Sequence, residues 1–137
     1  MDKKTGNAGK TGKIGKMDKV QKYSEERPWG GFDEFCKNAQ CTVKILYLKP
    51  NEALSLQYHY KRNEFWKVIK GEATVILGEK QIKAKAGDEF FIPMEEKHRI
   101  VAGSSPVEVL EISFGYFDEK DEVRLEDKYK RVVGTII

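Results

Sequence analysis

The sequence has few of the residues that usually build a metal or redox centre: two histidines and two cysteines among 137 residues. Cys36 and Cys41 are separated by four residues, so the two thiols could face one another across a hairpin. One such pair does not make the disulfide framework of a small secreted protein. We therefore expect two reduced thiols, as is usual in the cytoplasm.

Long apolar runs are also missing from the chain. A transmembrane helix needs roughly 20 consecutive apolar residues, and no segment approaches that length. The N-terminus lacks the apolar stretch of a signal peptide as well. These absences predict a cytoplasmic protein that does not bind membranes.

The first 22 residues contain many lysines and glycines and almost no large apolar side chains. Such a segment cannot bury enough surface to offset its loss of conformational entropy, so we expect residues 1–22 to be a disordered basic tail. A basic tail could contact nucleic acid, but this one has no aromatic residues between its lysines. We expect no nucleic-acid partner, and a single folded domain over residues 23–137.

From Trp29 onward the chain shows no helical period of adequate length, and short β-type segments alternate with turns. Glycine and proline mark many of the turns, as at Pro50, Gly71, Gly87 and Pro93. The predicted strands are 32–36, 41–49, 54–59, 64–70, 73–77, 80–84, 89–92, 98–101 and 107–114. Short strands at this spacing predict an all-β sandwich or barrel. The charged segment after Phe117 is expected to pack on the barrel or on a second copy.

Both histidines occur in settings that suit a single metal site. Gln57 and His59 are two residues apart on a predicted strand, so their side chains share a face. Glu64 follows a polar hairpin tip, and His98 comes 34 residues later. An amide oxygen, two imidazoles and a carboxylate form a suitable set of ligands for a divalent metal. The alternative is one surface histidine and one hydrogen-bonded core histidine.

The spacing of these residues matches the two sequence templates of the cupin superfamily. The first template, G-x5-H-x-H-x3–4-E-x6-G, aligns with Asn51, Gln57, His59, Glu64 and Gly71. The second template, G-x5-P-x-G-x2-H-x3-N, aligns with Gly87, Pro93, Glu95, His98 and Ala102. Every spacing fits, and four residues differ from the templates: Asn51, Gln57, Glu95 and Ala102. The resemblance implies a cupin-type double-stranded β-helix (a jelly-roll barrel). It also implies a divalent metal ion (Zn, Mn, Co or Fe) held by Gln57, His59, Glu64 and His98.

Within that superfamily, the segments 54–59 and 62–66 closely resemble the type II phosphomannose isomerase domain. The resemblance extends from Arg27-Pro28-Trp29-Gly30 to Val123-Arg124 and on to Arg131. That domain is commonly the C-terminal part of a mannose-1-phosphate guanylyltransferase. The chain has no segment that could form the nucleotide-binding domain, so we expect a free-standing domain. The resemblance implies a metal-dependent isomerase that interconverts mannose 6-phosphate and fructose 6-phosphate.

The resemblance also implies roles for residues around the metal. Glu111 is expected to be the general base that moves the proton between C1 and C2 of the sugar. Arg124 and Arg62 are expected to bind phosphate or steady a developing oxyanion. Further candidates for binding the sugar phosphate are Arg27, Tyr116 and Lys61. The simpler interpretations are a solvent-facing Glu111, solvated basic side chains and a Tyr116 that only packs.

Two departures from the family motivate other hypotheses. Phe65 stands where the family usually has histidine, and Ser113 stands where it usually has glutamine, beside Glu111. These changes favour a second hypothesis, a non-catalytic cupin that binds a sugar phosphate or sugar nucleotide; a metal-dependent dioxygenase is a third. We also expect a homodimer formed through Val132–Ile137 or the Phe32–Leu48 region, because an exposed apolar edge would otherwise promote aggregation.

Overall fold

The computed structural model describes residues 3–4, 22–127, 129 and 134–135. These residues are mostly strands and turns, as predicted, and one short 3₁₀ helix is the only helix among them. The earlier strands are β1 (Lys3–Lys4), β2 (Tyr23–Arg27), β3 (Gly30–Glu34), β4 (Cys41–Leu48), β5 (Leu56–His59), β6 (Asn63–Lys70) and β7 (Glu72–Leu77). The later elements are β8 (Lys80–Lys85), β9 (Glu89–Ile92), β10 (His98–Ala102), β11 (Val107–Phe114), η1 (Glu119–Asp121), β12 (Glu122–Glu126) and β13 (Gly134–Thr135).

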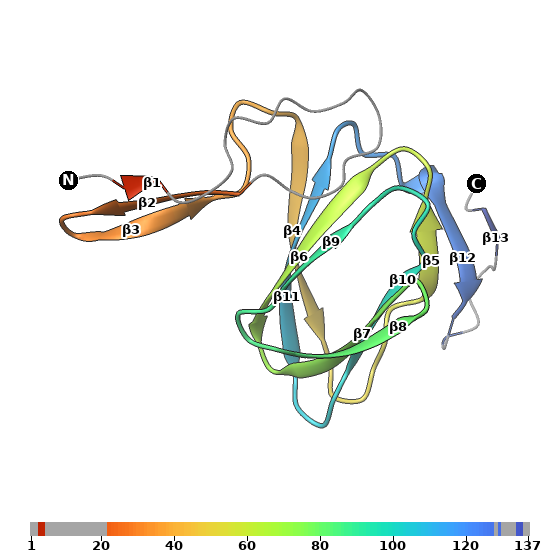
Figure 1. Cartoon of the computed structure of the whole chain (residues 1–137). Helices are drawn as coiled ribbons and strands as arrows, with labels where there is room; N and C mark the ends of the chain where they lie inside the picture. Colours follow the sequence, from red (N-terminus) through yellow and green to blue (C-terminus); the bar gives the residue numbers. More distant parts are fainter. Residues whose placement is uncertain (1–2, 5–21, 128, 130–133, 136–137) are drawn as a thin grey trace.

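Two antiparallel sheets form the barrel (Figure 1). One has the strand order β13-β12-β5-β10-β7-β8, and the other has the order β4-β11-β6-β9. Strands that are far apart in the sequence are neighbours, since β12 pairs with β5 and β11 pairs with both β4 and β6. This connectivity between two sheets is a jelly roll, so the predicted all-β fold class is confirmed.

The interior of the barrel is apolar at one end and polar at the other. Side chains alternate between interior and exterior along each strand. The buried interior series along β11 is Val107, Val109, Glu111 and Ser113, and along β6 it is Val68, Trp66 and Glu64. Both strands therefore change from apolar to polar in the same direction across the sheet. Buried polar groups are costly unless they have partners, so the polar end is where a functional site is expected.

The apolar end is filled by tightly packed side chains from both sheets. Val75 on β7, Ile100 on β10 and Val107 on β11 have no exposed surface. Trp66 belongs to the same cluster and is also completely buried. Burying a large apolar side chain stabilises a fold by about 1.5–3 kcal/mol. This cluster therefore supplies a rigid base for the polar end.

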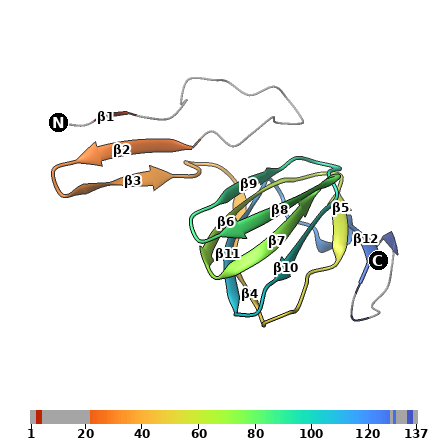
Figure 2. The same ribbon diagram turned by 60° about the horizontal axis from the view of Figure 1, so that its bottom comes forward.

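The β2–β3 hairpin forms an arm that projects from the barrel (Figure 2). The prediction of a strand over 32–36 was shifted, because β3 covers Gly30–Glu34. Its partner β2 was not predicted at all. The β2 sequence Tyr-Ser-Glu-Glu-Arg lacks the apolar alternation on which a strand prediction depends.

Cys36 and Cys41 lie at either end of the connection between β3 and β4. Their sulfur atoms are 3.3 Å apart, and both thiols are free. The hydrogen bond with Cys41 raises the pKa of the Cys36 thiol. The thiols do face one another, but the proposed hairpin between their strands was wrong: β3 pairs with β2, and β4 pairs with β11.

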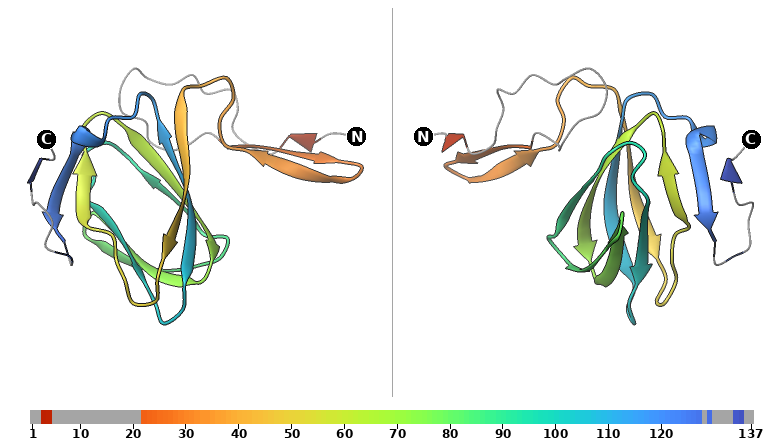
Figure 3. Two further views of the ribbon diagram at one scale, coloured as in Figure 1. Left: turned by 180° about the vertical axis from the view of Figure 1, so that it is seen from behind. Right: turned by 45° about the vertical axis from the view of Figure 1, so that its right-hand side comes forward.

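The packing expected of Val132, Val133, Ile136 and Ile137 lies outside the described residues, whereas Tyr129 donates a hydrogen bond to Glu52 at 2.9 Å. The charged segment after Phe117 also forms a strand of the barrel. It passes through η1 into β12, which lies beside β5 on the side of the barrel away from the arm (Figure 3). In this pairing Glu122 is opposite His59, and Arg124 is opposite Gln57. Both β12 residues therefore lie on the face of the sheet that carries Gln57 and His59.

Two predictions concern residues outside the described ranges. The disordered tail expected over residues 1–22 includes only three described residues, Lys3, Lys4 and Lys22, so it stays a prediction. The dimer contact through Val132–Ile137 also stays a prediction, because only Gly134 and Thr135 are described there. Within the described ranges, no helix has the length and apolar character needed to cross a membrane.

Candidate metal centre

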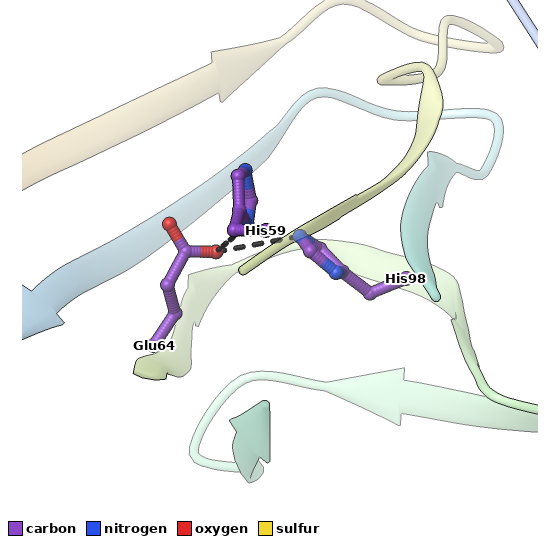
Figure 4. Close-up of side chains that lie close together, drawn as sticks. All are labelled: His59, Glu64 and His98. Carbon is purple, nitrogen blue, oxygen red and sulfur yellow. Dashed lines mark ion pairs between the residues drawn. The ribbon is translucent and has the colours of Figure 1, made fainter. Parts of the chain in front are cut away.

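Three buried side chains converge at the polar end of the barrel (Figure 4). His59 ends β5, Glu64 is near the start of β6 and His98 begins β10, and their ligand atoms lie within 4.8 Å of one another. Glu64 Oε1 is 3.3 Å from His98 Nε2 and 3.7 Å from His59 Nδ1. The structure thus brings together three of the four predicted metal ligands.

Strand pairing explains why these residues meet. β10 lies beside β5, with His98 opposite Gln57, so the two histidines come from adjacent strands. A short connection after His59 leads into β6 and turns Glu64 toward the same space. Glu64 is also opposite Ser113 on β11. Both sheets therefore contribute to the cluster.

Each of the three residues has one buried polar atom without a hydrogen-bond partner. These atoms are His59 Nε2, Glu64 Oε1 and His98 Nε2. An unsatisfied buried polar group costs about 1–3 kcal/mol, so three in one place call for a ligand. Imidazole nitrogens and a carboxylate oxygen are common ligands of Zn, Mn, Co and Fe. The donor set fits a divalent cation.

Glu64 is held in its negatively charged form. Burial acts to raise the pKa of Glu64, but the close contact with His98 and the charges of His59, His98 and Arg62 outweigh burial and lower the pKa to about 2. Glu64 Oε2 accepts hydrogen bonds from Arg62 Nε and from the Ser113 hydroxyl, each at 3.0 Å. These two donors occupy Oε2 and leave Oε1 directed toward the histidines.

Gln57, the fourth predicted ligand, lies in β5 between His98 on one side and Arg124 on the other. Its amide oxygen accepts a hydrogen bond from the Ser55 hydroxyl at 2.5 Å. An amide oxygen has two lone pairs, so this contact leaves one available. Coordination by Gln57 stays a prediction.

Arg62 is buried instead of solvated, contrary to the simpler interpretation of its sequence position. Besides its bond to Glu64, its Nη1 donates to the Asp118 carbonyl oxygen at 3.2 Å. Its guanidinium also lies 4.3 Å from the centre of the Phe117 ring. Arg62 is therefore fixed beside the centre, where it supports the position and charge of Glu64.

Glu111 points into the barrel, which excludes the simpler interpretation of a solvent-facing carboxylate. Its Oε2 accepts a hydrogen bond from Trp66 Nε1 at 3.0 Å. Burial raises the pKa of Glu111, and the negative charge of Glu64 raises it further. The Trp66 ring in turn packs against His98, with ring centres 5.5 Å apart. Glu111 is thus a buried carboxylate with increased proton affinity near the cluster.

Glu122 is a residue of this site that the sequence prediction missed. Its Oε1 lies 3.7 Å from His59 Nε2, and its Oε2 lies 3.3 Å from Arg124 Nε. Burial acts to raise the pKa of Glu122, but the nearby His59 ring and the charges of Arg124 and Arg62 lower it. The sequence signal that could have identified Glu122 is its spacing from Arg124. Residues two apart on a strand share a face, so both side chains would point to the same side of the sheet. Without a prediction of β12, that signal could not be used.

The three predicted substrate-binding residues lie outside the metal cluster. Lys61 is exposed at the β5–β6 connection, where its backbone nitrogen donates to Asp121. Tyr116 is 74% exposed and follows β11. Arg27 lies on the arm, where it pairs with Glu25 and its guanidinium is 5.4 Å from the Phe32 ring centre. Their roles in binding substrate stay predictions.

Sequence comparisons match this chain to one protein family and to part of several longer proteins. Residues 15–127 match the family model described as the mannose-6-phosphate isomerase C-terminal domain. The chain is 37% identical over 106 residues to mannose-1-phosphate guanylyltransferase 2 of Escherichia coli O157:H7, covering 76% of this chain and 22% of that protein. It is 38% identical over 107 residues to the xanthan biosynthesis protein XanB of Xanthomonas campestris, covering 77% and 23%. The chain thus spans less than a quarter of the length of these relatives.

Solved structures with the same fold are cupins. A cupin protein from Bacteroides fragilis superposes with a TM-score of 0.51 at 26% identity, covering 56% of this chain and 72% of that chain. A sugar phosphate isomerase of the cupin superfamily from Silicibacter pomeroyi has a TM-score of 0.53 at 21% identity, covering 57% and 52%. The second likeness concerns the fold alone. Together they confirm the cupin fold that the two sequence templates predicted.

Proposed function

Because the chain belongs to the mannose-6-phosphate isomerase C-terminal family, we propose that it is a metal-dependent isomerase that interconverts mannose 6-phosphate and fructose 6-phosphate. The observation that carries this proposal is the buried cluster of His59, Glu64 and His98 with its three unsatisfied atoms. A bound divalent metal would polarise the sugar carbonyl and so make the neighbouring C–H acidic. Gln57 is the candidate fourth ligand.

Glu111 is the proposed general base. Its raised pKa brings it closer to the pH at which a carboxylate both accepts and returns a proton efficiently. In the forward direction Glu111 takes the proton from C2, and the carbonyl oxygen on C1 gains a proton to give an enediol. Glu111 then returns its proton to C1 while the oxygen on C2 loses one, which yields the ketose. No net proton is gained or lost.

Arg124 is the basic residue best placed to bind the phosphate or a developing oxyanion. It lies on β12 at the polar end, and its side chain is only 13% exposed. Its Nε faces Glu122, and the planar guanidinium carries further donors in a fork that suits phosphate. Arg62 is the second candidate, but its hydrogen bonds to Glu64 and Asp118 favour a supporting role.

The alternative is a cupin that binds a sugar phosphate or sugar nucleotide without turnover. The phenylalanine at position 65, where the family usually has histidine, now gives this alternative less support. Phe65 is on the exterior face of β6 and packs on Phe35, with ring centres 5.1 Å apart. The other reason remains, because Ser113 does contact the cluster through Glu64. A serine at this position supports the Glu64 carboxylate but reaches less far into the interior than a glutamine would.

A coupled assay with mannose 6-phosphate tests the proposal. The protein is first loaded with Mn²⁺, Co²⁺ or Zn²⁺, and its metal content is measured. Turnover that disappears with chelator and returns with metal is the expected result. Stoichiometric metal with no turnover would overturn the enzyme hypothesis, and stabilisation of that same protein by mannose 6-phosphate would favour the binding protein.

A further inference from the structure

The inner face of β4 carries a lysine beside the candidate base. In the β4–β11 pairing Lys44 is directly opposite Glu111, so both side chains start on the same face of the sheet. Residues paired in this way have their Cβ atoms about 4.5–5.5 Å apart. Glu111 is buried, whereas Lys44 is exposed on the end strand of its sheet. The lysine side chain therefore leads from the candidate base toward solvent.

The ring of Phe117 holds the end of this lysine side chain. Lys44 Nζ lies 4.3 Å from the centre of the ring. The Arg62 guanidinium carbon is also 4.3 Å from the ring centre, so two cations share one aromatic side chain. A cation close to an aromatic ring is attracted by the electron density of its face. Phe117 thus keeps the flexible Lys44 at the polar end of the barrel, where Arg62 supports Glu64.

The two cations differ in the partners that balance their charge. Arg62 Nε pairs with Glu64 Oε2 at 3.0 Å. Lys44 forms no ion pair with any carboxylate of the described residues. Burial and the charge of Glu64 raise the pKa of Glu111, and the charge of Lys44 acts in the opposite direction. Lys44 is therefore a cation that influences the candidate base without being neutralised by it.

We propose that Lys44 is a substrate-binding residue that binds the phosphate group of the sugar phosphate at the mouth of the barrel. The inference rests on the proposed function and names the residue that recognises the phosphorylated end of the substrate. C1 and C2 react beside Glu111, and the phosphate on C6 is at the other end of the sugar. It therefore extends toward the exposed side of the site, where Lys44 leads. An ammonium group has a full positive charge and three N–H donors, which suits the phosphate oxygens.

Arg124 takes a different part in this arrangement. It lies on β12, in the other sheet and on a different side of the barrel from β4 (Figure 3). Its Nε is 3.3 Å from Glu122 Oε2, so a carboxylate already balances its charge. A paired cation offers less net charge to a phosphate dianion than the unpaired Lys44 does. The phosphate therefore belongs to Lys44, which leaves Arg124 the developing oxyanion.

Isothermal titration calorimetry of the metal-loaded protein tests Lys44 without relying on turnover. The probes are mannitol 6-phosphate, an acyclic sugar phosphate with no carbonyl group to isomerise, and mannitol, which lacks the phosphate. The unmodified protein should bind the phosphorylated probe more tightly. Lys44→Gln should weaken binding of mannitol 6-phosphate by about 10–100-fold, because a charge-assisted contact is lost, and should leave binding of mannitol unchanged. Lys44→Arg keeps the charge and should retain most of the affinity.

Lys83→Gln is the matched control, because Lys83 is an exposed lysine on strand β8 and the substitution makes the same change of charge. This variant should bind mannitol 6-phosphate as the unmodified protein does. Equal affinities in Lys44→Gln and Lys83→Gln would overturn the role of Lys44 and leave the isomerase proposal standing. Weaker binding in Lys44→Gln alone would support that role, and it would do so even if the metal-loaded protein showed no turnover and the isomerase proposal failed.

Discussion

The indole nitrogen of Trp66 donates a hydrogen bond to the carboxylate of Glu111 across the β6–β11 ladder, at 3.0 Å and within the barrel. Trp66 is completely buried in the apolar core, whereas Glu111 lies where the interior becomes polar. The contact thus joins the rigid end of the barrel to the candidate base. It restrains Glu111 at one oxygen and leaves the other to meet a substrate.

Glu111→Gln is expected to separate catalysis from stability. The variant should keep its metal but lose about 10²–10⁴-fold in kcat, because proton transfer alone is removed. Its metal-free form should be more stable than the unmodified protein at pH 7. The raised pKa means that folded Glu111 holds a proton at pH values where the unfolded chain has lost it, so the free energy of unfolding falls as pH rises through this range.

Urea denaturation at several pH values measures this effect. The unmodified metal-free protein should lose stability as pH rises from the unfolded glutamate pKa, about 4.3, toward the raised folded value, and the variant should lose less. Trp66→Phe is the complementary control, because loss of the indole hydrogen bond should raise the pKa of Glu111 still further. Full isomerase activity in Glu111→Gln would exclude Glu111 as the base.

The metal ligands should differ in importance. His98→Ala and Glu64→Gln should each remove metal and activity together, with losses of affinity beyond the about 10–100-fold typical of residues that act through a ligand. Gln57→Ala should weaken binding less, because water can replace a neutral oxygen that is already hydrogen-bonded to Ser55. Metal analysis alongside the coupled assay measures both. Stoichiometric metal and full activity in His59→Ala and His98→Ala would mean that the histidines are structural.

The homodimer expected through the Phe32–Leu48 region has a specific candidate surface. Val43, Ile45 and Tyr47 lie on one face of β4 and are 55%, 44% and 72% exposed. β4 is also the end strand of its sheet in the described structure, so its outer edge offers backbone hydrogen-bonding groups. Light scattering should give twice the mass of one chain, and Ile45→Glu with Tyr47→Glu should give a monomer. Leu125→Glu, at an exposed position on β12, is the control; a monomeric unmodified protein would exclude the dimer.

The strands that could be predicted are those with apolar alternation bounded by glycine or proline. β9 and β11 were predicted with the bounds Glu89–Ile92 and Val107–Phe114 that the structure has. β2 and β12 were missed because their sequences, Tyr-Ser-Glu-Glu-Arg and Glu-Val-Arg-Leu-Glu, are dominated by charged residues. β12 is stabilised by its pairing with β5, and long-range pairing of this kind leaves no local pattern in the sequence.

The contrast between local sequence patterns and long-range strand pairing also explains which parts of the site could be predicted. His59, Glu64 and His98 fit a template of fixed spacing, and their convergence follows from it. Glu122 meets His59 only through the β12–β5 register, so a missed strand meant a missed residue. The orientation of Phe65 was also open until the register of β6 was known, because a shift of one residue reverses the two faces of a strand.

Glu95 and Asn51 give the last prediction, which concerns the backbone. Both residues stand where the cupin templates have glycine, and both adopt a left-handed conformation, with φ of 68° and 63°. For most side chains this conformation costs about 1–2 kcal/mol, whereas asparagine tolerates it better and glycine adopts it freely. Glu95→Gly should therefore stabilise the protein by about 1 kcal/mol or less, since glycine also gains entropy in the unfolded chain.

Asn51→Gly is the matched comparison, and it should gain less stability than Glu95→Gly because asparagine already suits the conformation. Denaturant titration of the metal-free variants measures both changes, and metal content should be unaffected. Glu95 lies three residues before His98, and its backbone nitrogen donates to the His59 carbonyl oxygen at 2.6 Å, a contact that glycine retains. Destabilisation by Glu95→Gly would show that the Glu95 side chain contributes more than the strain of its backbone costs.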